Sequence, residues 1–128
     1  MKRSIFLLIA AIIAALIGVL SLFLPGKMAE GFGMTPSPMI TFLIRELGAF
    51  SLCAGLLNFL VRKDPDSKTL KAILIFNMVY HFIMMPVNFV GLSESVFVLS
   101  QSIPPMIIHL FVGIGSFLYL SKMKTAAN

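Results

Sequence analysis

The chain has 128 residues, of which 59% are hydrophobic and 12% charged, and its mean hydropathy is +1.01. This composition excludes an ordinary soluble globular domain, because too few polar side chains remain to cover an exterior in water. The net charge of +5 would suit a nucleic acid, but the basic residues lie at the ends of apolar runs, so they indicate membrane topology and no nucleic acid is expected.

Four apolar runs, at residues 5–24, 39–61, 69–90 and 103–120, predict four transmembrane helices, since about 20 residues of helix cross a bilayer. The first run is longer than the roughly 7–15 apolar residues of a signal peptide, so we predict a retained span. Small residues share one face of this run and predict close helix packing: Ala11, Ala14, Ala15 and Gly18. We expect an all-α fold, with residues 1–128 forming one transmembrane four-helix bundle.

Glycines and prolines mark the predicted connections between the spans. Residues 25–38 and 91–102 are predicted to be loops. Ser37 has the chemistry of an N-cap for the second helix. The pair Pro104-Pro105 is expected to open the fourth helix.

The distribution of basic residues predicts the orientation in the membrane. Four spans arranged up-down-up-down place both termini on one side, and Lys27 alone lies on the other side. Eight basic residues share the side of the termini: Lys2, Arg3, Arg62, Lys63, Lys68, Lys71, Lys122 and Lys124. Because cytoplasmic loops are rich in Lys and Arg, we expect a multi-pass protein of the cytoplasmic (inner) membrane with both termini inside.

Arg45 and Glu46 lie side by side within the second predicted span. A charge at the centre of a bilayer costs at least ~2.5–3.5 kcal/mol, so such residues need partners, water or a route to the headgroups. Side chains on a helix lean toward its N-terminus, so Arg45 has the alternative of reaching the outer headgroups. Glu46 would then be its counter-charge.

The third and fourth spans each carry one polar or small face. On the third, Asn77, His81, Met84 and Asn88 recur at helical spacing with Tyr80 beside them, and on the fourth the series is His109, Gly113 and Ser116. Such faces turn inward in lipid. At 1.5 Å per residue, their depths predict an outer-half polar cluster of Arg45, Glu46, Tyr80, His81, Asn88 and His109, and an inner-half pair of Asn58 and Asn77.

These features favour a non-enzymatic membrane protein. It would be an accessory subunit of a membrane complex or a binder of a small lipophilic molecule at the outer-half polar cluster. Its candidate partners are therefore the bilayer, another membrane protein or a second copy, and that small molecule. The alternative is a proton-coupled transporter that uses Glu46 and His81 as a relay.

His81 and His109 lie at matched depth on consecutive helices, which is also what haem ligation by two histidines requires. The polar neighbours make such a pocket unusual, so we expect no haem and no metal. We expect instead that the histidines form hydrogen bonds within the cluster, with at least one facing Glu46 or Tyr80. Cys53 is the only cysteine, so no disulfide forms within the chain.

Several short motifs in the first two-thirds of the chain occur in a known class of membrane proteins. They are Phe23-Leu24-Pro25, Phe32-Gly33, Arg45-Glu46-Leu47-Gly48-Ala49 and Gly55-Leu56-Leu57-Asn58. In this order they resemble the small four-span bacterial proteins of the DoxX-like class. The resemblance implies a four-helix bundle and, in some members, a place in a membrane redox complex, and it implies no catalytic residues.

Overall fold

The computed structural model describes residues 1–96 and 98–123, and every regular element in these ranges is a helix. Four helices are long: α1 (Arg3–Phe23), α3 (Pro38–Val61), α4 (Lys68–Ser93) and α5 (Leu99–Ser121). Each is long and apolar enough to cross a membrane, which confirms the all-α class and indicates a multi-pass membrane protein. Lys124, which was counted with the basic residues near the termini, lies outside the described ranges.

Two of the predicted loops were wrong in part, because each contains helix. A short helix, α2 (Pro25–Gly31), follows α1 directly, with Pro25 at its first position and a 2.9 Å ion pair between Lys27 and Glu30. Helix α5 begins at Leu99 rather than at the Pro-Pro pair, which lies within its second turn. The fixed φ of proline is compatible with a helix. Pro104 and Pro105 therefore remove two backbone donors near the start of α5 without ending the helix.

Serine side chains cap the two middle helices, as the sequence predicted for Ser37. The Ser37 hydroxyl accepts a hydrogen bond from the Ile40 N–H at 3.2 Å and begins α3. Ser67 accepts from the Leu70 N–H at 3.1 Å and begins α4 in the same way. Each bond satisfies a backbone donor that the first turn of a helix leaves without a partner.

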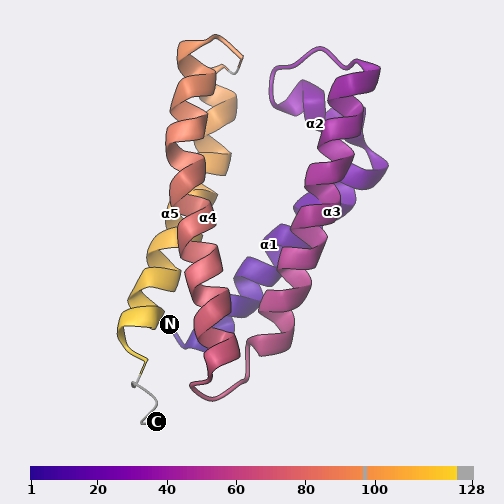
Figure 1. Cartoon of the computed structure of the whole chain (residues 1–128). Coiled ribbons are helices and arrows are strands. Elements are labelled where there is room, and N and C mark those ends of the chain that lie inside the picture. The colour runs from indigo at the N-terminus through magenta and orange to yellow at the C-terminus, as the bar shows by residue number, and fades with distance from the viewer. Residues whose placement is uncertain (97, 124–128) are drawn as a thin grey trace.

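The long helices pack as two pairs, α1 with α3 and α4 with α5 (Figure 1). Glycines make the first pair close: a Cβ on Gly18 would lie 2.9 Å from the Gly48 carbonyl oxygen. A Cβ on Gly55 would lie 3.0 Å from the carbonyl oxygen of Ala11. The predicted small-residue face of α1 therefore packs against α3, because only residues without bulky side chains allow two backbones to approach so closely.

The two pairs meet at the end that holds the N-terminus and diverge toward the end that holds α2 (Figure 1). The buried apolar core lies where they meet and consists of Phe6, Leu7, Ala10, Val61, Leu70, Leu74 and Val112. Polar contacts join the pairs at this end: Arg3 bonds to the Asp66 carboxylate and to the Asp64 carbonyl oxygen, and the Tyr119 hydroxyl donates to the Met1 carbonyl oxygen at 2.6 Å. The apolar core therefore joins the two helix pairs at this end, whereas at the other end the segment after α2 lies against the start of α5, where a Cβ on Gly33 would be 3.0 Å from Val98 Cγ2.

Candidate functional site

A cavity of about 240 Å³ lies between the two helix pairs, and we call it the inter-pair cavity. Its wall includes residues of all four long helices and of the segment that follows α2. Most of the wall is apolar, with side chains such as Ile13, Ile17, Leu47 and Ile108. This arrangement of apolar walls around a few polar groups is typical of a small-molecule site.

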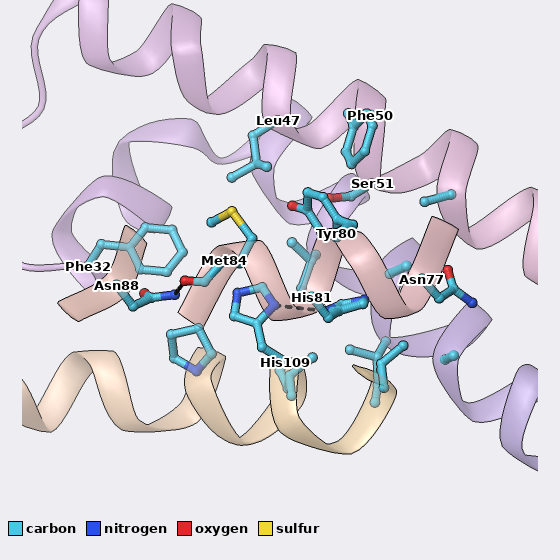
Figure 2. Close-up of a pocket in the computed structure, with 18 of the residues that line it drawn as sticks. Phe32, Leu47, Phe50, Ser51, Asn77, Tyr80, His81, Met84, Asn88 and His109 are labelled. Carbon is cyan, nitrogen blue, oxygen red and sulfur yellow. Dashed lines mark hydrogen bonds between the residues drawn. The ribbon is translucent and has the colours of Figure 1, made fainter. Parts of the chain in front are cut away.

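Helix α4 supplies more of the polar side chains of the cavity than any other helix, as the spacing on the third predicted span indicated. Asn77, His81, Met84 and Asn88 all line it, and Tyr80 lines it beside them (Figure 2). Since residues at these spacings fall on one side of a helix, the face recognised in the sequence is the face that points between the helix pairs.

His81 and His109 form a direct hydrogen bond across α4 and α5, with their Nδ1 atoms 2.8 Å apart (Figure 2). The bond requires one Nδ1–H donor and one bare Nδ1 acceptor. A neutral imidazole carries a single N–H, so the donor ring has a bare Nε2 and the acceptor ring has an Nε2–H. The imidazole pair therefore has one further donor and one further acceptor, both within residues that line the cavity.

Tyr80 lies against both histidines, with ring centroids 5.1 Å from His81 and 6.2 Å from His109. Its ring also contacts that of Phe50 of α3, with centroids 5.1 Å apart (Figure 2). It stacks on Phe76 of its own helix, with centroids 6.0 Å apart. The structure therefore places Tyr80 next to both histidines, as the sequence predicted for at least one of them. The contact between Tyr80 of α4 and Phe50 of α3 also joins the two helix pairs through their aromatic rings.

The asparagines make different contacts. Asn58 of α3 and Asn77 of α4 bond reciprocally, with N–O distances of 2.7 and 3.3 Å, so they form the pair expected from the sequence. Asn88 donates to the Met84 carbonyl oxygen of its own helix at 2.7 Å. The Asn58–Asn77 pair thus links the two helix pairs, whereas Asn88 bonds within α4, and all three residues line the inter-pair cavity.

Arg45 and Glu46 do not join the other predicted site residues. Both side chains are exposed, neither lines the inter-pair cavity, and neither makes an ion pair or hydrogen bond with any residue that the structure describes. The expected convergence fails because α3 turns Gly48 toward α1 and Leu47 toward the cavity, so Arg45 and Glu46 lie on the remaining, outward part of its circumference.

Sequence reasoning missed Gln101 and Ser102, which line the cavity from the first turn of α5. Gln101 Oε1 is buried and has no hydrogen-bond partner, and the Ser102 hydroxyl donates to the Val98 carbonyl oxygen at 3.2 Å. These residues fell in a predicted loop, so their helical face was not considered. A helix start placed at Leu99 would have set Ser102 and His109 seven residues apart on one face.

The donor set limits what the cavity can hold. None of its lining residues is an Asp, Glu, Lys or Arg. The described residues contain no group of three or more His, Cys, Asp or Glu side chains placed to hold a metal ion. The Nδ1 atom of each histidine is hydrogen-bonded to the other histidine, which leaves only Nε2 of each ring for another partner. The arrangement therefore suits hydrogen bonding to a neutral molecule.

Comparison with models of known protein families, with curated proteins and with solved structures found no match. The resemblance to the DoxX-like class therefore stays a prediction.

Proposed function

We propose that this protein is a non-enzymatic membrane protein that binds one small, neutral, lipophilic molecule in the inter-pair cavity. The observation that carries the proposal is the imidazole pair of His81 and His109 inside a mostly apolar cavity between diverging helix pairs. An apolar body would occupy the walls, and a hydrogen-bonding head would meet the imidazole pair.

The cavity sets the size of the molecule. An engineered cavity of about 150 Å³ takes up benzene, so by proportion the 240 Å³ here suits roughly ten non-hydrogen atoms. The absence of charged lining residues favours a neutral molecule, because an ion moved from water to such a site would lack a counter-charge. A single hydroxyl suits the imidazole pair well, since it both donates and accepts.

Binding of 4-propylphenol, which has this size, tests the proposal in protein reconstituted into nanodiscs. We expect saturable binding, followed by saturation-transfer NMR, and weaker binding of 4-propylanisole, in which a methyl ether replaces the hydroxyl. The substitution His81→Phe should weaken binding of the phenol about tenfold, or about 1.4 kcal/mol, as expected for one lost hydrogen bond, and should leave the ether unchanged.

Two alanine substitutions provide a matched control. Ala54 lines the inter-pair cavity, so Ala54→Leu should fill part of it and weaken both probes by at least about tenfold. Ala72 is exposed on α4 and does not line the cavity, so Ala72→Leu should change neither. Equal affinities for the phenol in wild type, Ala54→Leu and Ala72→Leu would show that the probe dissolves in lipid or binds elsewhere.

The geometry favours binding over the proton-coupled transport that the sequence left open. Such a relay would need Glu46 close to His81, but Glu46 is exposed outside the cavity that His81 lines. A role as an accessory subunit is compatible with binding, and the ligand would then be a molecule shared with the partner complex. Proton flux in proteoliposomes that disappears in Glu46→Gln would contradict this preference.

We also infer an up-down-up-down bundle in a bacterial cytoplasmic membrane, with both termini in the cytoplasm. The skew of basic residues supports this orientation, and the bonds from Arg3 to Asp66 and from Tyr119 to Met1 bring the basic chain ends together. The inter-pair cavity would then extend from the inner-half pair of Asn58 and Asn77 into the outer half of the membrane.

A membrane-impermeant thiol reagent tests the orientation in a Cys53→Ser background. Gly31 and Lys63 are exposed at opposite ends of the molecule and are suitable positions for cysteine. We expect Gly31→Cys to react in intact cells and Lys63→Cys to react only after the membrane is opened. The reverse pattern would overturn the orientation.

A further inference from the structure

The outward face of α3 carries a pair of opposite charges with no partner in the described part of the chain. Arg45 and Glu46 are both exposed there. Arg45 is the eighth residue of α3, so it lies about 10 Å along the helix from its first residue. In a helix that crosses a membrane, charges that face lipid at such depth are costly, so a partner outside the chain is expected.

The residues around these charges form a continuous exposed seam along α3. Phe42, Glu46, Ala49, Cys53, Leu56 and Leu60 follow one another at alternating spacings of four and three, and all are exposed. This is the spacing of the contact positions in a helix pair that packs by knobs into holes. Ala49 and Cys53 are small and allow close approach. Glu46 lies to one side of the midline of this seam, and Arg45 lies just outside the seam on the other side.

We propose that this α3 seam is the interface of a parallel homodimer, in which Arg45 of each copy pairs with Glu46 of the other. A two-fold axis along the membrane normal keeps equal residues at equal depth. Glu46, one heptad before Cys53, faces its own copy across the axis, and Arg45 of each helix lies beside Glu46 of its partner, so one interface holds two arginines and two glutamates and forms both ion pairs at once. The inference does not depend on what the inter-pair cavity binds.

A second copy fits this seam better than a lipid headgroup does, because the two charges are opposite and adjacent. A headgroup phosphate would neutralise Arg45 and leave Glu46 facing lipid. The same seam on a second copy satisfies both charges, and one polar contact position within an apolar seam fixes the register of two helices. Charge complementarity therefore points to self-association.

Cys53 allows the wild-type chain to report on the interface. In the dimer the two Cys53 residues face each other in the seam, within the Cα separation of about 4.4–6.8 Å that a disulfide requires. Iodine added to native membranes should therefore oxidise the two thiols to one disulfide and give a species of twice the chain's 14.0 kDa. The control is Ile12→Cys in a Cys53→Ser background, since Ile12 is 50% exposed on α1 and lies outside the seam.

We expect at least tenfold more cross-linked dimer from Cys53 than from the control cysteine. Glu46→Gln should reduce it without adding a charge, while Glu46→Arg and Arg45→Glu should each abolish it. The double substitution, Arg45→Glu with Glu46→Arg, should restore it, which a merely misfolded variant could not do. Equal cross-linking of Cys53 and the control, cross-linking of Cys53 only to a different protein, or failure of the double substitution to restore the dimer would overturn the proposal.

Discussion

The crossing of α1 and α3 should be sensitive to one added methyl group at Gly48. A Cβ built on Gly48 would lie 2.8 Å from Ser21 Cβ, 2.9 Å from the Gly18 carbonyl oxygen and 3.1 Å from the Leu22 nitrogen. Separations under 3.0 Å are essentially never seen for real Cβ atoms, and two of these three neighbours are backbone atoms that cannot rotate away. Gly48→Ala must therefore push the two helices apart.

The expected loss of stability follows from two opposing effects. Overpacking of a tight contact costs about 1–3 kcal/mol. Alanine favours the helix over glycine by up to about 1 kcal/mol, which offsets part of that cost. Because backbone atoms at Gly48 cannot rotate away, we take the upper part of the overpacking range, about 2–3 kcal/mol. The net change for Gly48→Ala is then a loss of about 1–2 kcal/mol in the free energy of unfolding, a factor of about 5–30 in the ratio of folded to unfolded protein.

Reversible unfolding by SDS in mixed micelles, followed by circular dichroism, measures this change. The matched control is Gly31→Ala in α2, because a Cβ at Gly31 meets nothing within 4 Å. We expect Gly31→Ala to be neutral or slightly stabilising. The reasoning would be refuted if Gly48→Ala unfolded at the same SDS fraction as Gly31→Ala, since the close approach of the backbones would then not limit the packing of this pair.

Two further predictions concern the contacts between the helix pairs. Asn58→Leu leaves Asn77 without its partner and should lower the free energy of unfolding by about 1–3 kcal/mol. The double substitution of Asn58→Leu with Asn77→Leu should cost less than the sum of the two single substitutions. Additive losses in SDS unfolding would show that the two amides do not interact. Arg3→Ala removes the bonds to Asp66 and to the Asp64 carbonyl oxygen, and it should lower the free energy of unfolding by only about 0.5–1 kcal/mol because the ion pair is partly exposed. Protection of the 62–66 turn from hydrogen exchange should fall. Unchanged protection would contradict the contact.

The sequence by itself determined the elements that depend on local chemistry. Runs of about 20 apolar residues indicated four helices, because a bilayer-spanning backbone must satisfy its own hydrogen bonds. Ser37 was recognised as a cap because its hydroxyl and the first turn of α3 are neighbours in the chain. The face of α4 that carries His81 and Asn88 followed from the helical period alone.

The tertiary structure decided which of these faces meet. Periodicity defines a face of a helix but not the neighbour toward which that face is turned, and depth along the membrane does not fix rotation about the helix axis. Arg45 and Glu46 therefore matched His81 in depth and yet lie outside the inter-pair cavity, because Gly48 turns the adjacent part of α3 toward α1. The hydrogen bond between His81 and His109 likewise forms where Gly113 lies close against α4, with a Cβ at Gly113 3.1 Å from Phe82 Cε1 and in contact with His81 Cβ at 3.4 Å. Close contacts of this kind join residues far apart in the chain, so only the packed molecule defines them.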